Sequence, residues 1–582
     1  MFSRVAIHLT RCNSASLRSS RLVLPSHPYR RLFELPRRGQ IRPWYRRFWP
    51  LTIAFTVVST GIPIGYIVYR DLLQESWMKK DKTSEENFDE NSESVSQSEL
   101  DTLLSQTQQL LNSELYLNRS SAFIVPIRLF FRTLKLVIIF TPVIIFYFIQ
   151  DKFAPHLYEK WCFTLRRSFE FCGPCFIKLG QWMATRPDLF STQFCSIFNE
   201  LHSNAPVHSE SQTRKLLHDN NIHIKSTSTD FLSKPLASGA IAQVYRCKVG
   251  NLDLIMKVRH PNVQNKIYYD LKILNIFTRV LTKLSRDQFK WLNLEDNIHS
   301  FTKNMLLQTN LVIETKNLQI FERNFEKYKS NIRFPHVDPS LPSTKDILFQ
   351  TYENGQLLND FMDTCKDPTI RKKLAYLGVN AYLKMLFVDN FIHADLHPGN
   401  ILVHLDEKSP GEPIIIFLDV GLTSSLSRSD KKNFYDLFRA IANYDSTEAA
   451  TLIIERAPNA KEIDEQSKIG FRKEMAVLIE GVIRTPLKQV EVGLVLRNVL
   501  DLGKKYHIKL ESNFTTLALG TIIIEGIGRQ LDPDLDFVSA ARPFLQKDFR
   551  LVKSYLNGVF QRNIANTSWW SRLFNKTEQN LA

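Results

Sequence analysis

The feature that most constrains the fold is a pair of polar clusters in the second half of the chain, each set beside apolar runs. In the first cluster, Asp395 and Asn400 stand five residues apart, with apolar residues before and after them. In the second, five consecutive apolar residues end directly at Asp419, and Gly421 follows two residues later. Short apolar runs bounded by turn residues are typical of buried strands. We therefore predict a buried strand that ends at Asp419 and a polar loop that holds the other pair.

The order and spacing of these residues resemble the catalytic loop and the Asp-Phe-Gly segment of kinases. In that resemblance Asp395 would accept a proton or orient the nucleophile, while Asn400 and Asp419 would hold Mg²⁺. Phosphoryl transfer needs such groups because the developing charge is met by metal ions and a lysine, with little covalent chemistry from the protein. The pattern therefore predicts a phosphoryl-transfer site.

The candidate for that lysine is Lys257. Two β-rich runs, residues 241–249 and 252–258, are separated by a Gly-Asn pair, which indicates a hairpin, and Lys257 lies near the end of the second run. Taken alone, a lysine between apolar neighbours on a strand is more often surface-facing than catalytic. Glu314 lies in a helical pattern over residues 296–325 and is predicted to pair with Lys257. The alternative is a solvated helix glutamate.

The chain departs from protein kinases in ways that bear on its substrate. It has no G-x-G-x-x-G motif, and residues 236–245 hold the place of that loop. The candidate nucleotide-binding residues there are Ala237, Ser238, Gly239 and Ala240. Ala394 stands where an arginine would read a phosphorylated activation segment, and no A-P-E motif follows Gly421. Little chain therefore remains to form a platform for a peptide.

Further motifs make the chain similar to the UbiB family of atypical kinases, also called aarF-domain-containing (ADCK) kinases. These motifs are a K-x-G-Q extension at residues 176–181 with the segment 185–190 after it, His260-Pro261 after the lysine strand, and residues 525–533. The resemblance covers about residues 155–545. The nucleotide loop looks most like the branch that holds the ADCK-two-type proteins and their fungal mitochondrial relatives.

The resemblance implies an α+β fold: a two-lobed protein-kinase-like fold with an N-terminal helical K-x-G-Q extension over the active site. It also implies binding of ATP with Mg²⁺ and a role in coenzyme Q biosynthesis or distribution and in membrane lipids. The family's K-x-G-Q lysine enters the pocket and blocks protein substrates. Lys178 is therefore predicted to gate the site, with Gln181 beside it.

Two positions depart from the family pattern. Gly239 interrupts a loop that is Ala-rich in many members, and glycine would give this loop freedom at positive φ, so nucleotide preference is expected to differ. Gln308 and Asn310 stand where many members carry Glu-x-Asp. The acidic partner of Lys178 is therefore expected to be missing or supplied elsewhere.

The N-terminal part is predicted to contain a targeting sequence and a membrane anchor. Residues 1–47 hold eleven Arg, no Lys and one acid, which is typical of a mitochondrial presequence; the alternative is a generic basic tail. Residues 51–69 are uncharged, and residues 50–70 are predicted to span the inner membrane once, the alternative being a buried core helix. By the positive-inside rule the kinase-like domain would face the intermembrane space. A polar linker is predicted for residues 71–120.

A second apolar stretch, residues 136–149, is short for a span. Just before it Arg128, Arg132 and Lys135 share one helical face, and apolar residues occupy the others. This pattern predicts an amphipathic membrane-interface helix over residues 121–150, and a helix packed on the globular domain is equally favoured. A full span is less favoured; it would return the rest of the chain to the matrix.

Composition limits the remaining function classes. The net charge is +16, but residues 1–47, with eleven Arg and one acid, contribute +10 of it. The basic balance therefore describes that segment and does not indicate nucleic acid. Seven cysteines in 582 residues exclude a disulfide framework of the small secreted kind. Cys172 and Cys175 form a C-x-x-C outside the βαβ context of a redox motif, so redox or metal function is disfavoured.

The predicted boundaries of the globular part are residues 151–230 for the helical extension, 231–355 for the N-lobe, 356–560 for the C-lobe and 561–582 for a tail. The function expected from these observations is that of an atypical kinase or ATPase using Mg·ATP. Its expected partners are the inner membrane and membrane lipids or an isoprenoid quinone-type small molecule; no protein partner is indicated. The alternative is a non-catalytic nucleotide-binding scaffold or lipid-handling protein. A protein kinase is the least favoured reading.

Overall fold

The computed structural model describes residues 121–186, 190–202, 207–223, 232–284, 294–405, 411–442, 445–483, 491–510, 512–545 and 549–561. All of them lie within residues 51–582, one of the two units into which the chain divides. The predicted presequence, transmembrane helix and polar linker, and the tail from residue 562, lie outside the described residues. They stay predictions.

The extension is built from helices. These are α4 (Ser121–Phe153), α5 (Tyr158–Cys172), α6 (Pro174–Ala184), α7 (Thr192–Asn199) and α8 (Glu210–Asp219). Gly173 separates α5 from α6 at φ 99°, a conformation that favours glycine, and Pro174 begins α6, where a missing N–H costs nothing. The turn folds α6 back so that Phe169 and Phe176 pack edge to face, with ring centroids 5.7 Å apart.

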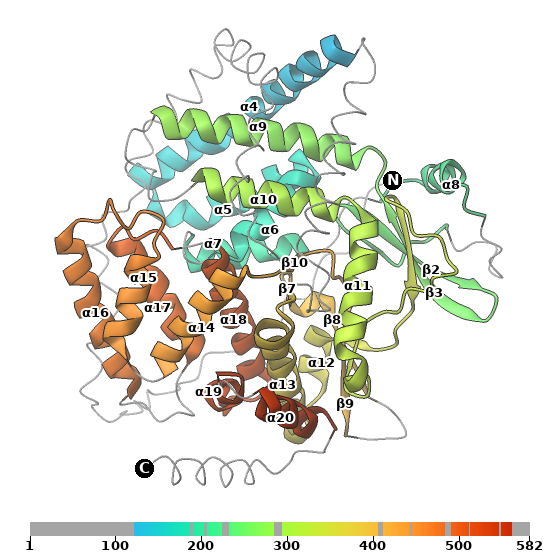
Figure 1. The fold of residues 1–582 in the computed structure, drawn as a ribbon. Coiled ribbons are helices and arrows are strands. Elements are labelled where there is room, and N and C mark those ends of the chain that lie inside the picture. Colours follow the sequence, from blue (N-terminus) through green and yellow to red (C-terminus); the bar gives the residue numbers. More distant parts are fainter. Residues whose placement is uncertain are drawn as a thin grey trace, which may run out of the picture. The chain divides into compact units, whose positions relative to one another are not determined.

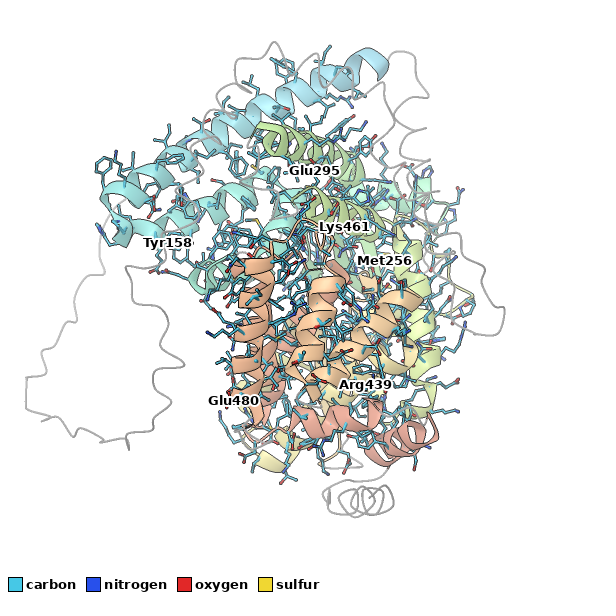
Figure 2. The ribbon with its side chains drawn as sticks, turned by 60° about the vertical axis from the view of Figure 1, so that its left-hand side comes forward. Tyr158, Met256, Glu295, Arg439, Lys461 and Glu480 are labelled. Atoms are coloured by element: carbon cyan, nitrogen blue, oxygen red, sulfur yellow. The ribbon has the colours of Figure 1, made fainter. Side chains whose placement is uncertain are left out.

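Helix α4 packs one face against the other helices of the extension and exposes the other. The packed face carries Val125, Leu129, Leu136 and Val143, all buried. On the same face the Arg132 guanidinium donates to both carboxylate oxygens of Asp270 on α9 (Val263–Leu284), at 2.6 and 2.8 Å. The opposite face exposes apolar side chains, including Ile127, Phe130, Phe131, Ile138, Ile145 and Phe153. Figure 2 shows α4 at the edge of the fold, with Tyr158 beyond its end.

Among the described residues, one segment is long and apolar enough to cross a membrane, residues Val125–Phe153 of α4. Two interpretations of residues 121–150 were open, a membrane-interface helix and a helix packed on the globular domain. Each of them describes one face of α4. The basic residue at the centre of the predicted interface face, Arg132, is engaged by Asp270 inside the protein. The helix is therefore packed on its neighbours, and it still presents an apolar surface.

A four-stranded antiparallel sheet, in the order β1-β2-β3-β5, forms the N-lobe. Its strands are β1 (Ala237–Ser238), β2 (Ala242–Val249), β3 (Leu252–Arg259) and β5 (Ile347–Thr351). The predicted hairpin is confirmed, since β2 pairs with β3 from Ala242↔Arg259 to Val249↔Leu252. Successive side chains on β3 point to opposite faces. Met256, which Figure 2 labels, is fully buried in the core, and its neighbour Lys257 therefore points to the other face.

The long helix predicted over residues 296–325 is wrong, because the structure breaks it in two. Helix α10 (Leu294–Gln308) ends before Thr309, and α11 (Leu311–Phe325) begins after Asn310. Asn310 has extended backbone angles, φ −116° and ψ 104°, and its side chain accepts from the N–H of Val312 at 3.1 Å. An asparagine side chain that satisfies the first free N–H of a helix is a strong start signal. It lets α11 change direction and lie against the sheet (Figure 1).

The C-lobe combines short strands with helices. A second sheet, in the order β4-β9-β8-β6, contains β4 (Ile332–Arg333), β9 (Pro413–Phe417), β8 (Ile401–Leu405) and β6 (Gln356–Leu357), and β7 (Ile392–His393) pairs with β10 (Thr423–Ser424). The helices are α12 (Leu358–Thr364), α13 (Pro368–Leu383), α14 (Arg428–Ala442), α15 (Ser446–Glu455), α16 (Glu465–Ile483), α17 (Val492–Lys505), α18 (Ser512–Leu531), α19 (Phe537–Ala541) and α20 (Phe549–Gln561). The described part is thus α+β, with a sheet lobe, a helical lobe and a helical extension, as predicted (Figure 1).

Candidate active site

Lys257, Glu314 and Asp419 form one cluster between the two lobes. Lys257 Nζ donates to both carboxylate oxygens of Glu314, each at 2.8 Å, and to Asp419 Oδ2 at 3.3 Å. The Lys257 side chain is 16% exposed, that of Glu314 5% and that of Asp419 43%. Lys257 is therefore not the surface lysine that its strand alone would favour, and Glu314 is not a solvated helix residue.

The position of Glu314 follows from the helix break. Because Asn310 starts α11, Glu314 falls in the first turn of that helix, on the buried side with Leu311 and Leu318. A carboxylate is favourable near a helix N-terminus, where the unpaired N–H groups carry partial positive charge. One turn further along, the amide of Asn317 donates to the carbonyl of Val420 at 2.8 Å and so ties α11 to the segment after Asp419.

The cluster sets the charge states of its members. Partial burial alone would raise the pKa of Asp419, but the ammonium groups of Lys257 and Lys178 outweigh it and hold that pKa below its ordinary value. Burial would lower the pKa of Lys257, and Asp419 and Glu314 together raise it instead. Burial raises the pKa of Glu314, although Lys257 opposes the change. Asp419 is therefore an anion at neutral pH and the most open member of the cluster.

The catalytic-loop residues lie beside this cluster. His393 is buried, which lowers its pKa, and its Nδ1 accepts from the N–H of Asp395 at 3.2 Å. Asn400 Nδ2 donates to the carbonyl of Asp395 at 3.1 Å, and the carbonyl of Asn400 accepts from Leu418 N–H at 2.9 Å. The neutral imidazole and the amide thus shape the loop around Asp395 and bring Asn400 next to the strand that ends at Asp419.

Asn400 and Asp419 fit the predicted magnesium site. The Asn400 amide points its nitrogen at the Asp395 carbonyl, so its oxygen is the end that can ligate a cation. Magnesium prefers oxygen ligands and is usually held by one or two carboxylates together with phosphate oxygens. Within the described residues no cluster of three or more His, Cys, Asp or Glu side chains suits a metal ion, so a metal here would need ligands from the nucleotide.

Gly421 shows why this turn needs a glycine. A Cβ atom at this position would lie 3.1 Å from Asp419 Oδ1 and 3.6 Å from Glu314 Oε2. The N–H of Gly421 donates to the same Asp419 oxygen at 3.0 Å. A side chain here would crowd the Asp419 carboxylate and make an ordinary contact with Glu314, so the glycine leaves room for Asp419.

Lys178 has an acidic partner, and it is the predicted catalytic residue itself. Its Nζ lies 3.8 Å from Asp395 Oδ2, with the two side chains 20% and 25% exposed. Sequence reasoning left this partner open because Gln308 and Asn310 replace the usual acids. Gln181, predicted to lie beside Lys178 as part of the gate, donates to the carbonyl of Leu201 at 2.9 Å within the extension. Its gating role stays a prediction.

The predicted nucleotide loop connects β1 and β2. Ala237 pairs with Val244 and Ser238 with Gln243, and the N–H of Gly239 donates to the carbonyl of Ala242 at 2.9 Å. Gly239 does not use its freedom at positive φ in this structure, because φ is positive only at Gly173, Gly250 and Gly411 among the described glycines. The expected difference in nucleotide preference stays a prediction. A Cβ at Gly239 would meet only the Ala242 carbonyl oxygen at 3.5 Å, an ordinary contact. Ala240 lies in the turn after Gly239.

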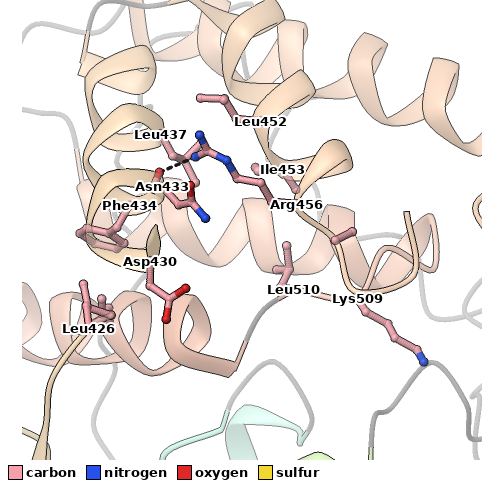
Figure 3. Close-up of a pocket in the computed structure, with 12 residues that line it drawn as sticks. Leu426, Asp430, Asn433, Phe434, Leu437, Leu452, Ile453, Arg456, Lys509 and Leu510 are labelled. Atoms are coloured by element: carbon pink, nitrogen blue, oxygen red, sulfur yellow. Dashed lines mark hydrogen bonds between the residues drawn. The ribbon is translucent and has the colours of Figure 1, made fainter. Parts of the chain in front are cut away.

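Two other features lie apart from this cluster. Burial raises the pKa of Cys172 to about 11 and raises that of Cys175 as well, which keeps both in the unreactive thiol form. A pocket of about 470 Å³, counting the solvent at its mouth, lies in the C-lobe and includes Leu426, Phe434 and Arg456 in its wall (Figure 3). Arg456 donates to the carbonyl of Asn433 there, at 2.7 Å. None of the predicted site residues lines this pocket.

Sequence reasoning missed two of the residues that build the site. Asn317 lies three residues after Glu314, a spacing that places both on one helical face, and this was the available signal. Asn390 has a left-handed backbone, φ 50°, and its side chain both donates to the carbonyl of Leu426 and accepts from its N–H, at 2.8 and 3.1 Å. A left-handed asparagine gives little sequence signal beyond a turn.

Comparison with known proteins agrees with the class that this geometry defines, a kinase-like fold. Residues 200–453 match the ABC1 atypical kinase-like domain, and residues 475–536 match the UbiB helical domain. The chain is 34% identical to a probable serine/threonine-protein kinase, abkC, of Dictyostelium discoideum, over 76% of this chain and 73% of the relative. It is 31% identical to a mitochondrial ABC1 family protein of Saccharomyces cerevisiae, over 66% and 68%. The chain belongs to the ABC1/UbiB family of atypical kinases.

Two more distant similarities extend the comparison. A probable protein kinase UbiB of Vibrio atlanticus is 29% identical, over 68% of this chain and 71% of the relative. Among solved structures, a Mycobacterium tuberculosis protein in complex with erythromycin is similar with a TM-score of 0.40 and 16% identity, over 69% of this chain and 97% of the other. The mitochondrial relatives and the apolar helix α4 support association with a mitochondrial membrane.

Proposed function

We propose that the chain is an atypical kinase or ATPase that uses Mg·ATP on a small or lipid-like substrate, and that it serves coenzyme Q (ubiquinone) and lipid homeostasis at the mitochondrial inner membrane. The observation that carries the proposal is the contact of Lys257 with both Glu314 and Asp419. Together with the Asp395 loop, this cluster holds the charged groups that phosphoryl transfer needs.

Each residue has a role in this proposal. Mg·ATP supplies the phosphoryl group, and Lys257, oriented by Glu314, contacts its phosphates. Asn400 and Asp419 hold the magnesium ion through oxygen atoms. Asp395 accepts the proton of a substrate hydroxyl or orients a water molecule. The loop from Ala237 to Ala240 covers the nucleotide.

The short segment after Gly421 supports a small substrate. Residues 422–427 alone separate Gly421 from α14, and much of that segment is held in place. Thr423 and Ser424 pair with β7, and the Asn390 side chain forms hydrogen bonds with both the carbonyl and the N–H of Leu426. A segment of this length, tied at both ends, offers little surface to a peptide. The exposed apolar face of α4 suits a lipid-like substrate and a membrane partner.

The packing of α4 supports the proposed topology. Its Arg132 is paired with Asp270 of α9, and α5 carries charged residues of its own, so this face of α4 cannot contact lipid tails. We take the predicted segment at residues 50–70 as the single crossing. The kinase-like domain would then lie in the intermembrane space, with the apolar face of α4 toward the inner membrane.

The test is nucleotide turnover by the purified full chain with Mg·ATP, measured in detergent and again in liposomes. Asp419→Asn serves as the blank, because it removes the proposed magnesium ligand. Turnover above this blank, with stimulation by lipid, is the expected result. If the chain bound Mg·ATP and showed no turnover above the blank in any lipid, the catalytic proposal would be refuted.

That second outcome would favour a nucleotide-binding scaffold or lipid-handling protein. One observation favours this alternative: Lys178 stands 3.8 Å from Asp395, so the structure shows the proposed base engaged by the extension. A site held in this way suits a protein in which nucleotide occupancy, and not turnover, is the signal.

Lys178→Met should raise basal ATP turnover. The change removes the ammonium group that engages Asp395 and keeps a side chain of similar length. A partly exposed ion pair is worth up to about 1 kcal/mol, which corresponds to a rise of about fivefold. Lys160→Met, at an exposed position on the neighbouring α5, is the matched control and should leave turnover unchanged. A fall in turnover for Lys178→Met would show that Lys178 assists the reaction and does not gate it.

A further inference from the structure

Two histidines that the site described above does not use face each other beside the nucleotide loop. His208 lies just before α8, and His260 follows β3. Their Nδ1 atoms are 2.7 Å apart, and the two rings meet edge to face with centroids 4.8 Å apart. Because this distance is that of a hydrogen bond, one Nδ1 carries a proton and the other does not.

His208 also belongs to a buried network of polar side chains. His208 Nε2 lies 2.9 Å from Thr213 Oγ1, which lies 2.8 Å from the hydroxyl of Tyr245. The side-chain nitrogen of Gln243 donates to the Tyr245 hydroxyl at 2.5 Å. The side-chain oxygen of Gln243 accepts from the backbone N–H of His208 at 2.9 Å. Thr213, Tyr245 and Gln243 are each at most 1% exposed. Buried groups of this kind must be satisfied by one another.

The carbonyl at the far end fixes the direction of every bond. His260 Nε2 lies 2.9 Å from the carbonyl oxygen of Gly239, which can only accept, so Nε2 carries the proton. A neutral His260 then has a bare Nδ1, and His208 Nδ1 must donate to it. His208 Nε2 is bare in turn and accepts from Thr213. Thr213 accepts from Tyr245, which accepts from Gln243. With both histidines neutral, this proton arrangement satisfies every bond from Gly239 to Gln243.

His260 holds the nucleotide loop at two points. Its ring donates to the carbonyl of Gly239, and its backbone N–H donates to the carbonyl of Ile241 at 2.9 Å. These two carbonyls stand on either side of Ala240, in the turn that connects β1 to β2. We propose that the His208–His260 pair is a positioning device for this turn, which sets nucleotide affinity through the neutral state of the two rings. The inference rests on the proposed function, since it takes this turn to be the nucleotide loop.

The surroundings of the pair disfavour a second proton. Burial, together with a smaller effect of His260, lowers the pKa of His208 to about 4. Burial also lowers the pKa of His260, and Lys266 on α9 acts in the same direction, against the Gly239 carbonyl. Tyr245 is the other titratable group in the network. A proton added at His260 Nδ1 would remove the acceptor that His208 Nδ1 needs, and protonating both rings would place two cations at hydrogen-bond distance.

The sign of the pH dependence follows from these shifts. A histidine whose pKa is lowered by folding keeps its native contacts above its ordinary pKa of 6.5, and loses them as the pH falls toward the lowered value. Nucleotide affinity should therefore be constant near neutral pH. It should weaken as the pH falls from 6.5 toward about 4, the lowered pKa of His208.

The test uses the full chain in detergent, with Mg·ATP as the probe. His260→Ala should raise the Kd for Mg·ATP about tenfold near neutral pH, the effect of losing one well-placed hydrogen bond. His260→Gln places an amide N–H close to where Nε2 lies, so it should keep most of the affinity and lose the acid dependence. His336→Ala is the control, because His336 is an exposed histidine paired with Glu322, and it should change neither quantity.

A second measurement separates this inference from the proposed function. Hydrogen exchange of the peptide that covers residues 237–245 reports on the turn without any nucleotide. The expected result is faster exchange in His260→Ala than in the wild type, with the rest of the N-lobe unchanged. Equal exchange and equal Kd in these two proteins would overturn the positioning role. If the wild type failed to bind Mg·ATP while His260→Ala still exchanged faster than the wild type, the link to the nucleotide and the proposed function would both be overturned. The contact between His260 and the turn would remain supported.

Discussion

Asp419→Asn should abolish both magnesium-dependent nucleotide binding and turnover, whereas Asp395→Asn should abolish turnover and leave binding in place. The difference follows from where the two carboxylates lie. Asp419 contacts Lys257 and is held as an anion, so its loss removes a magnesium ligand and changes the phosphate site together. Asp395 lies in the loop that His393 and Asn400 shape, away from the Lys257–Glu314 contact.

The expected losses are large. Removing one preorganised electrostatic group from such a site costs about 10²–10³ in turnover. Asp363→Asn, at an exposed position on α12, is the control and should behave as the wild type. Asp395→Asn and Asp363→Asn should unfold at nearly the wild-type temperature, because an amide of equal size replaces a partly or fully exposed carboxylate. Asp419→Asn should unfold at a lower temperature, because it removes an anion that contacts Lys257. The measurements are Kd for ATP with and without magnesium, and turnover in liposomes. Unchanged turnover in Asp395→Asn would remove Asp395 from the reaction.

The motifs in the sequence, through the resemblance to kinases and to the UbiB family, were enough to predict the fold class and the members of the central cluster. Asp395, Asn400 and Asp419 each stand at a fixed distance from an apolar strand, so their placement follows from strand ends. The pairing of Lys257 with Glu314 was also predicted, and the structure shows it at 2.8 Å. The functional roles of these residues stay predictions.

What the sequence could not supply depends on contacts between distant segments. The partner of Lys178 is Asp395, more than two hundred residues away, and no pattern in either segment indicates the contact. The break before α11 was hidden because residues 296–325 keep a helical apolar period through it, and only the cap at Asn310 marks it. The two faces of α4 could not be assigned, since the residue that decides between them is Asp270 on α9.

Glu314→Ala should be the most destabilising single change at the site. It leaves the Lys257 ammonium in a largely buried position with only the more distant Asp419 as a partner. Breaking a buried ion pair by removing one member costs about 3–5 kcal/mol, because the remaining charge is uncompensated. Chemical unfolding of the full chain in detergent, followed by a probe in the N-lobe, measures the change. Glu322→Ala, on the same helix and paired with His336 at the surface, is the control and should cost less than about 1 kcal/mol.

A double variant separates the structural role of the pair from its role in nucleotide binding. Lys257→Met with Glu314→Leu replaces both charges by apolar groups of similar volume, and such a replacement of a buried ion pair is often neutral for stability or stabilising. The double variant should therefore recover most of the stability that Glu314→Ala loses and still fail to bind Mg·ATP. Recovery of stability together with binding would show that Lys257 does not contact the nucleotide. A double variant as unstable as Glu314→Ala would show that the fold of the N-lobe depends on the charges themselves.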